Sequence, residues 1–381
     1  MMQISPETQL FIREHSSDDV RVLALQAKKY PDIDMPTAIT QIAGRKVAAE
    51  KIPSWWEIEK IWYPKHLSLE QCSSEITARY KARLLQGDSL TDLTGGFGID
   101  CSFLATGFKS ATYVERQEEL CEIAAHNFPV LNLNHINIKN EDGVTYLQAM
   151  SPVDCLFLDP ARRNEHGGKT VAISDCEPNV AELEELLLQK ANRVMIKLSP
   201  MLDLSLALKE LKQTQEVHIL SVNNECKELL ILLGQTSPTE ISSHCVNLST
   251  KGTQEEQHFV FTREQEQCSE CTYTDSLETY LYEPNASLLK AGAFRSIAAA
   301  YPVRKLHPNS HLYTSDTFIE NFPGRIFRIV NQCSFNKKEV KENLADLKKA
   351  NVTVRNFPAT VAELRKRIHL AEGGDTYLFA S

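Results

Sequence analysis

Seven short apolar segments follow one another between Ser89 and Gly234. They read SLTDLT, SATYVER, INIKNE, VDCLFLDP, RVMIKLSP, EVHILSV and ELLILLG. Amphipathic helices follow most of the first five, most clearly at Glu119–Phe128 and Val180–Ala191. This alternation predicts an α/β fold whose parallel sheet is covered on both faces. Only a few residues around NNECKE separate the last two segments, so we expect them to pair antiparallel at the sheet edge.

The pattern changes along the 381 residues, which are too many for a single ordinary core. Helical spacing of apolar residues predicts a helical region over 1–88, with one of its helices within Ser68–Leu85. The α/β domain is predicted over 89–235. Two alternating runs, SSHCVNLS and QHFVFT, predict a hairpin that opens a small α+β connecting region over 236–324. Residues 325–381 follow the order strand, helix, strand, helix, strand, which predicts a small C-terminal α+β module of its own.

The composition excludes several classes of protein. Hydrophobic residues make up 42% and charged residues 24%, which is typical of a soluble globular chain. No apolar stretch approaches the roughly 20 residues of a membrane-spanning helix. The N-terminal stretch MMQISPETQLFIREHSSDDV lacks the basic segment and apolar core of a secretion signal. We therefore expect a cytoplasmic protein with no membrane partner.

Ten cysteines are scattered along the chain, and Cys268 and Cys271 form a CxxC pair. With His244, Cys245 and His258 nearby in sequence, this pair could supply half of a zinc site. The second half has no regular spacing, so we expect reduced thiols and no metal.

The formal net charge of −9 conceals an uneven distribution. Residues 282–381 contain 15 Lys and Arg and 9 Asp and Glu, a net charge of +6, and the remaining residues carry −15. A basic end on an acidic body suggests a polyanionic partner for the C-terminal part. A solvated basic surface without a partner is the alternative.

The stretch DLTGGFGID, from Asp92 to Asp100, connects the first predicted strand to a helix. Glycines in this position let the backbone approach a ligand closely and adopt positive φ. A dinucleotide fingerprint needs a third glycine where Cys101 stands, and a Walker A loop needs a lysine that is absent. A carboxylate such as Asp92 would repel a phosphate and attract a cation.

The stretch resembles the first motif of class I S-adenosylmethionine-dependent methyltransferases, which implies a Rossmann-like seven-stranded sheet. Acidic residues also stand at the predicted ends of the next three strands, at Glu115, Asp142 and Asp159. The resemblance implies cofactor contacts from the following residues: Asp92, Thr94, Gly95, Gly96, Phe97, Gly98, Glu115, Arg116, Asp142 and Asp159. Each acidic residue taken alone could instead be a helix cap.

The fourth strand ends in Asp-Pro-Ala-Arg-Arg, which resembles the fourth motif of nucleic-acid methyltransferases. The resemblance implies catalytic roles for Asp159, Pro160 and Arg162, and contact of Arg162, Arg163 and Lys197 with the substrate. Ala161 replaces the usual second proline and Arg162 the aromatic residue. No cysteine follows the fifth strand, so covalent uracil-C5 chemistry is disfavoured and direct in-line transfer is expected. The stretch NEHGGKTVAISD, which includes His166, is typical of a loop over an acceptor site.

Two flanking segments, WYPKHLSLEQCSSEITARYKARLL and NVTVRNFPATVAELRKRIHLAEGGDTYLFA, are similar to a bacterial methyltransferase family with a C-terminal THUMP-like, ferredoxin-like module. The resemblance implies binding of RNA, above all tRNA, through the basic end. Arg355, Arg365, Lys366 and Arg367 are the candidate phosphate contacts. Two alternatives stay open: methylation of a small molecule or protein, and an RNA-binding protein that no longer catalyses.

Overall fold

The structure is a computed structural model that describes residues 4–162, 172–236, 238–250 and 256–381. Its N-terminal region is helical, as predicted. The helices are α1 (Pro6–Glu14), α2 (Val20–Leu25), α3 (Met35–Lys51), α4 (Pro53–Trp56), α5 (His66–Gln71) and α6 (Glu75–Ala82). The helical stretch predicted at Ser68–Leu85 contains α6 but is interrupted at its start, because Cys72 and Ser74 have extended backbones that end α5 and begin α6.

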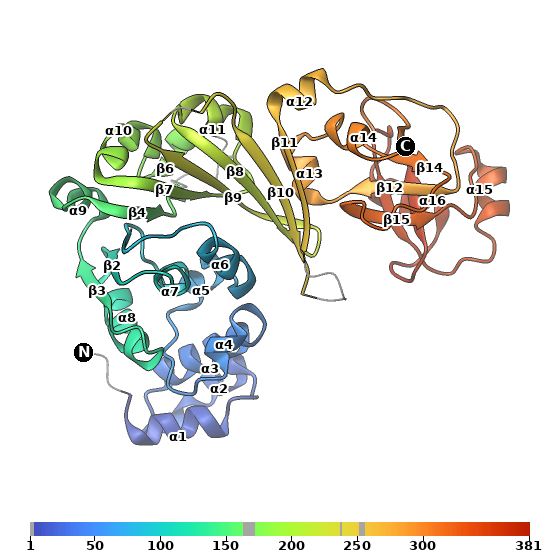
Figure 1. Ribbon diagram of the computed structural model, residues 1–381. Coiled ribbons are helices and arrows are strands. Elements are labelled where there is room, and N and C mark those ends of the chain that lie inside the picture. Colours follow the sequence, from blue (N-terminus) through green and yellow to red (C-terminus); the bar gives the residue numbers. More distant parts are fainter. Residues whose placement is uncertain (1–3, 163–171, 237, 251–255) are drawn as a thin grey trace. The chain divides into compact units, whose positions relative to one another are not determined.

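A nine-stranded sheet follows the helices (Figure 1). Its strands are β1 (Ser89–Asp92), β2 (Ser110–Glu115), β3 (Ile136–Asn140), β4 (Val153–Leu158), β7 (Ala191–Leu198), β8 (Thr214–Val222), β9 (Glu225–Gly234), β10 (Ser242–Leu248) and β11 (Glu256–Thr262). Their order is β11-β10-β8-β9-β7-β4-β1-β2-β3. The five strands β3, β2, β1, β4 and β7 are parallel neighbours, which confirms the predicted parallel core.

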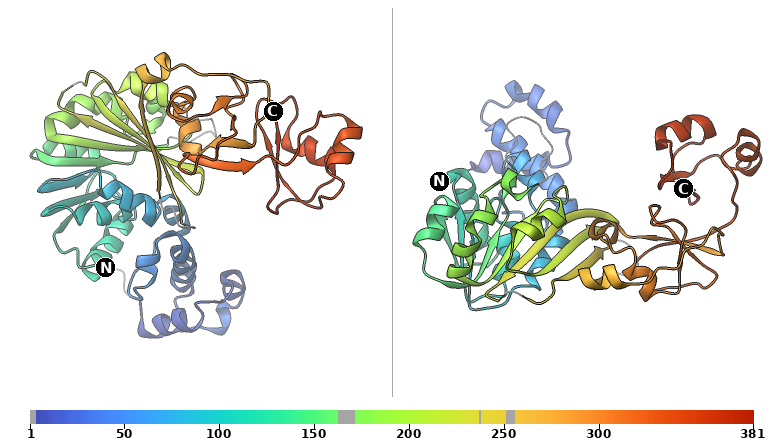
Figure 2. Two further views of the ribbon diagram at one scale, coloured as in Figure 1. Left: turned by 45° about the vertical axis from the view of Figure 1, so that its right-hand side comes forward. Right: turned by 90° about the horizontal axis from the view of Figure 1, so that it is seen from above.

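Helices alternate with these strands and cover both faces of the parallel part (Figure 2). They are α7 (Ile99–Ala105), α8 (Glu118–Val130), α9 (Gly143–Ala149), α10 (Val180–Lys190) and α11 (Leu204–Glu210). A separate pair of two-residue strands, β5 (Ala161–Arg162) and β6 (Cys176–Glu177), follows β4, and the short 3-10 helix η2 (Ile173–Asp175) precedes β6.

The last two predicted strands, β8 and β9, form a hairpin whose turn residues Asn223 and Asn224 both have positive φ. The prediction that this pair lies at the sheet edge is wrong. β9 pairs antiparallel with β7, and β10 and β11 extend the sheet beyond β8. The reason is burial: seven consecutive residues of β9 are buried, which requires a neighbouring strand on each side.

The C-terminal part contains a second sheet, with the order β13-β14-β12-β15. Its strands are β12 (Tyr280–Pro284), β13 (Arg304–Lys305), β14 (Tyr313–Ser315) and β15 (Gly324–Arg328), and the helices α12 (Arg263–Cys268), α13 (Ala286–Ala291) and α14 (Ser296–Ala300) accompany them. The chain ends with α15 (Lys337–Asn343), β16 (Asn351–Val354), α16 (Val361–Ile368) and β17 (Tyr377–Ala380).

The five predicted C-terminal elements are all present in the predicted order, but their strands do not form one sheet. Strands β16 and β17 pair in parallel with each other, but β15 pairs along its whole length with β12. Strand β12 is buried over four of its five residues, so its backbone groups need a strand on both sides. The strand at Gly324 therefore completes the preceding sheet.

Two expectations from the composition can be compared with the structure. All ten cysteines are free thiols in the structure. No helix within the described residues is long and apolar enough to cross a membrane.

Candidate active site

The glycine loop lies between β1, which ends at Asp92, and α7, which begins at Ile99. Gly96 and Gly98 have φ values of 55° and 87°, a backbone conformation that side chains disfavour. The amide of Gly95 donates to the carbonyl of Val114 on β2 (2.9 Å), so the loop is tied to the neighbouring strand. The predicted strand, tight loop and helix are therefore all present.

Gly95 has no space for a side chain, since a Cβ atom there would lie 2.3 Å from the ring of Tyr113. We expect Gly95→Ala to lower the free energy of unfolding by about 1–3 kcal/mol, the usual cost of overpacking. Gly107→Ala is the matched control, because its Cβ would meet the Leu104 carbonyl oxygen at an ordinary 3.7 Å. Urea unfolding of both variants measures the difference, and equal stabilities would contradict the steric argument.

Glu115, at the end of β2, holds the loop in place. Its Oε2 accepts a hydrogen bond from the amide of Gly96 (2.9 Å), and its Oε1 accepts one from the amide of Gln117 (2.8 Å). The residue is only 8% exposed. Each carboxylate oxygen has a second lone pair, so Glu115 can support the loop and still accept from a ligand hydroxyl.

Asp92 is the most deeply buried acidic residue of the loop, with 1% exposure. Its Oδ1 accepts from the amide of Thr94 (2.9 Å), whereas Oδ2 is buried without a hydrogen-bond partner among the described residues. Burial raises the pKa of Asp92 to about 8, although the bond from Thr94 lowers it in part. A buried carboxylate oxygen with no partner is a favourable place for a positively charged ligand.

Asp142 and Asp159 follow the next two strands, as predicted. Asp142 caps α9, since its Oδ1 accepts from the amides of Val144 and Thr145, both at 3.0 Å. One carboxylate oxygen of Asp142 therefore acts as a helix cap, which was the alternative to a cofactor contact. Asp159 follows β4, and its amide donates to Thr94 Oγ1 (2.6 Å), which links the fourth strand to the glycine loop.

A buried network of lysines and carboxylates lies next to Asp159. The Nζ atom of Lys197, on β7, is 2.6 Å from Asp159 Oδ2 and 3.1 Å from Asp100 Oδ2. Burial lowers the pKa of Lys197, but the carboxylates of Asp100 and Asp159 outweigh burial and hold this pKa well above its usual value. Burial also raises the pKa of Asp159. We therefore expect Lys197 to position Asp159, and its predicted contact with substrate stays a prediction.

The helical region completes this network through α6. The Nζ atom of Lys81 is 2.9 Å from Asp100 Oδ1 and 2.5 Å from Glu228 Oε2 on β9, and its side chain is fully buried. Ser73 Oγ accepts from both Lys81 (2.8 Å) and Lys197 (3.0 Å). Our sequence analysis missed Ser73, Lys81, Asp100 and Glu228. Lys81 could have been noticed, because it follows Thr77 and Ala78 on the buried face of α6 and a buried lysine requires a partner.

Some predicted cofactor residues point elsewhere. The Phe97 side chain is buried in the helical core beside Trp55 and Tyr63, so only its backbone can face a ligand. Arg116 is exposed and pairs with Glu177 at 3.3 Å. These two cofactor contacts stay predictions.

The predicted acceptor side of the site is described only in part. Pro160 is buried, and the backbone of Arg162 pairs with Cys176 in the short β5–β6 ladder. Arg163, His166 and most of the loop NEHGGKTVAISD lie outside the described residues.

The predicted phosphate contacts differ in their surroundings. Lys366 and Arg367 are exposed on α16, and Arg365 is 3.6 Å from Glu372. The guanidinium of Arg355 lies 2.7 Å from the buried Glu283, a carboxylate that it shares with Arg325. Contact of Arg355 with phosphate would have to displace this ion pair.

The first seven long strands of the chain are β1, β2, β3, β4, β7, β8 and β9. Numbered one to seven in that order, they lie in the large sheet as 3-2-1-4-5-7-6, and the seventh, β9, is antiparallel to the fifth. The glycine loop follows the first strand. Carboxylates end the first and second strands, at Asp92 and Glu115, and Asp159 follows the fourth. This strand order, with the glycine loop after the first strand, is that of the class I methyltransferase fold.

Comparison with known proteins identifies the family. A family model of a ferredoxin-like domain matches residues 280–323, and a model described as THUMP domain-like matches residues 324–381. No curated protein matches the chain. The solved structure of a "putative methyltransferase" from Porphyromonas gingivalis W83 is 34% identical with a TM-score of 0.86, over 100% of this chain and 96% of that chain. The chain belongs to the family of that protein.

Other solved structures resemble only part of the chain. An rRNA methylase from Streptococcus thermophilus is 14% identical with a TM-score of 0.31, over 42% of this chain and 93% of that chain. A second "putative methyltransferase", from Streptococcus mutans and in complex with SAH, has the same identity and TM-score, over 42% of this chain and 96% of that chain.

Proposed function

We propose that this protein is an S-adenosylmethionine-dependent methyltransferase that methylates a base of tRNA or another structured RNA by direct in-line transfer. One observation supports the proposal above all. The glycine loop is tied to Glu115 on one side and to Asp159 on the other, at the strand ends of a class I sheet. When bound, the cofactor would supply a methyl group on a positively charged sulfur.

The residues present fit this cofactor. Asp92 offers a buried carboxylate whose Oδ2 has no partner among the described residues, and the cofactor carries both a sulfonium and an ammonium group. Glu115 would accept from the ribose hydroxyls, and Asp142 would lie on the adenine side. Gly96 and Gly98 let the backbone approach the ligand, because their φ values exclude bulky side chains.

Cofactor binding is expected to release a proton at pH 7. With a pKa of about 8, Asp92 is mostly protonated in the free protein, and a cation beside it would lower that pKa. Calorimetric titration in two buffers of different ionisation enthalpy would show close to one proton released per bound cofactor. The Asp92→Asn variant should release none, and release of the same size from that variant would assign the proton to another group.

The acceptor side supports direct transfer. Asp159 lies beside Lys197, so its carboxylate can orient a nucleophile or accept a proton from it. Strand β7 is followed by Ser199 and Pro200, where a covalent uracil-C5 mechanism would need a cysteine. In-line transfer to a positioned nucleophile needs no such covalent step.

The proposed RNA partner follows from the C-terminal part. Residues 324–381 match a THUMP domain-like model, and they lie within the segment 282–381, which carries the net charge of +6 described above. Lys366 and Arg367 expose their side chains on α16, where they would contact phosphate without reading sequence.

Replacement of both Lys366 and Arg367 by alanine is expected to weaken tRNA binding and to make it less dependent on salt. Each lost phosphate contact lowers the slope of log affinity against log salt by about one. Filter binding at salt concentrations from about 50 to about 200 mM measures both the affinity and its dependence on salt. Lys109→Ala is the control, since Lys109 is exposed but pairs with Asp88 outside the basic end. Equal losses in both variants would indicate a non-specific charge effect.

Mass spectrometry of nucleosides, from cells with and without the protein, tests the whole proposal. Loss of one methylated nucleoside, restored by the wild-type chain and not by Asp159→Ala, is the expected result. An unchanged nucleoside profile with intact tRNA binding would favour the non-catalytic RNA-binding alternative. An unchanged profile without tRNA binding would favour a small-molecule or protein substrate.

A further inference from the structure

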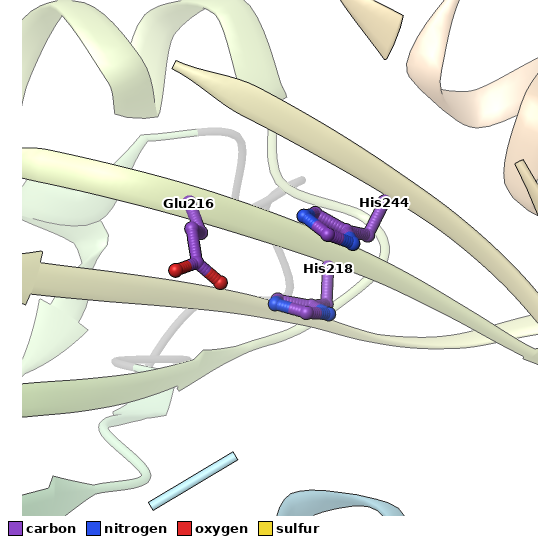
Figure 3. A group of neighbouring side chains, drawn as sticks. All are labelled: Glu216, His218 and His244. Atoms are coloured by element: carbon purple, nitrogen blue, oxygen red, sulfur yellow. The ribbon is translucent and has the colours of Figure 1, made fainter. Parts of the chain in front are cut away.

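A cluster of two histidines and a glutamate plays no part in the proposed methyl transfer. Glu216 and His218 belong to β8, and His244 belongs to the neighbouring strand β10. One carboxylate oxygen and one imidazole nitrogen from each histidine lie within 4.8 Å of one another (Figure 3). Glu216 and His218 are two residues apart on one strand, so the pleat of β8 places both side chains on the same face.

We propose that Glu216, His218 and His244 bind a divalent transition-metal ion, with Zn²⁺ as the best match. Two imidazoles and one carboxylate form a ligand set that zinc uses when it keeps a fourth position for water. Imidazole nitrogens favour zinc and its neighbours in the first transition row over Mg²⁺ or Ca²⁺, which prefer oxygen. The proposal is independent of the methyltransferase function and goes beyond it.

The distances are compatible with closure around an ion. Ligand bonds of about 2.0–2.1 Å in a tetrahedron place the ligand atoms roughly 3.3 Å apart. The present atoms lie within 4.8 Å, and the His218 and His244 rings stack with centroids 4.4 Å apart. Binding would therefore require the two rings to rotate out of their stack, so that one nitrogen of each points at the ion together with the Glu216 carboxylate.

His244 is oriented from outside the cluster, as metal-binding histidines usually are. Its Nδ1 lies 3.2 Å from His258 Nε2 on β11, and its Nε2 lies 3.1 Å from Ser242 Oγ. Whichever nitrogen takes the metal, the other retains a hydrogen-bond partner. These contacts make His258 and Ser242 positioning residues for the site.

The surroundings set the expected strength of binding. His218 is 2% exposed, whereas the Glu216 side chain is 32% exposed, so an ion from solution can reach the cluster. Arg193 lies 2.9 Å from Glu216 Oε1, and a metal would have to share this carboxylate with the guanidinium. We therefore expect a moderate affinity, which excess chelator should reverse.

Calorimetric titration of the chelator-treated full chain with ZnCl₂ tests the site. The wild-type chain should bind one Zn²⁺. Glu216→Gln and His244→Gln should each weaken binding at least tenfold, and His258→Gln should weaken it about 10–100-fold, the usual cost of losing an outer partner. His126→Gln, a change of the same kind on α8, should leave the affinity unaltered. Undiminished binding by both Glu216→Gln and His244→Gln would overturn the proposal.

The cysteine pair needs its own control, because Cys268 and Cys271 could take up zinc instead. The Cys268→Ser, Cys271→Ser double variant should bind Zn²⁺ as the wild type does. X-ray absorption of the zinc-loaded chain should show only nitrogen or oxygen ligands at about 2.0–2.1 Å, and a sulfur shell near 2.3 Å would overturn the proposal. Melting curves without metal would show whether each variant is folded. If His244→Gln is unfolded, Glu216→Gln still tests the site, because the Glu216 side chain is partly exposed and its replacement leaves the core intact.

Discussion

Replacement of Asp92 by asparagine is expected to weaken S-adenosylmethionine binding by about 10–100-fold. Asparagine retains the size of the side chain and the oxygen that accepts from Thr94, but it loses the charge that faces the proposed cation. A hydrogen bond to a charged group contributes about 1.5–3 kcal/mol, which corresponds to this loss of affinity. Calorimetric titration with the cofactor measures the loss.

The same substitution is expected to stabilise the free protein at neutral and alkaline pH. Burial raises the pKa of Asp92 to about 8, whereas an unfolded aspartate titrates near 3.9. The folded state therefore keeps a proton that the unfolded state has released. The contribution of Asp92 to stability is complete below about pH 4 and is lost as the pH rises towards 8. Asparagine cannot ionise, so Asp92→Asn avoids this loss.

Urea unfolding of wild type and Asp92→Asn at several pH values tests the second effect. The advantage of the variant should grow between about pH 4 and pH 8 and then level off. Asp88→Asn is the control, because the Asp88 side chain is 70% exposed and pairs with the exposed Lys109. If Asp92→Asn bound the cofactor as tightly as the wild type, Asp92 would be excluded from the cofactor site, whatever the stability of the variant.

Replacement of Lys81 by methionine is expected to lower the free energy of unfolding by about 3–5 kcal/mol. Lys81 is fully buried between Asp100 and Glu228, so its loss leaves buried carboxylate charge without its cation. Methionine matches the length of the side chain and replaces only the charge. Chemical denaturation at neutral pH measures the change.

Two further variants separate burial from charge. Arg79→Met removes another cation of α6, but the Arg79 side chain is 60% exposed and its pair with Glu75 should contribute less than about 1 kcal/mol. The Lys81→Met, Glu228→Leu double variant should recover part of the loss, since Lys197 still neutralises Asp100. A Lys81→Met loss no larger than that of Arg79→Met would contradict the buried-network interpretation.

Much of the site could be predicted because its residues belong to local patterns. Asp92, the glycines and Glu115 stand at the ends of apolar segments, and parallel strands bring their carboxyl ends to one edge of a sheet. Phe97 belongs to the same local motif, yet its side chain lies in the helical core. The direction of a side chain within a loop depends on packing partners that the motif does not contain.

The lysine network could not be predicted from motifs. Lys81 and Glu228 are 147 positions apart, and their pairing depends on contact between α6 and β9. The position of β9 inside the sheet was also missed, because the turn at Asn223 and Asn224 determines that β8 and β9 pair but not which of them meets β7. The partner of β15 was missed for the same reason. The alternation of residues in a sequence indicates that a segment is a strand, but it does not indicate which strand lies beside it.

The sequence by itself determined the class of fold, the glycine loop and the acidic strand ends, because each depends on residues close together in the chain. Tertiary structure alone decided the order of β8 and β9, the partner of β15, the pairing of Lys81 and Lys197 with Asp100, and the meeting of Glu216, His218 and His244. These features join strands and helices far apart in the chain. Hydrogen bonding across strands and neutralisation of buried charge select such partners, and neither leaves a local pattern.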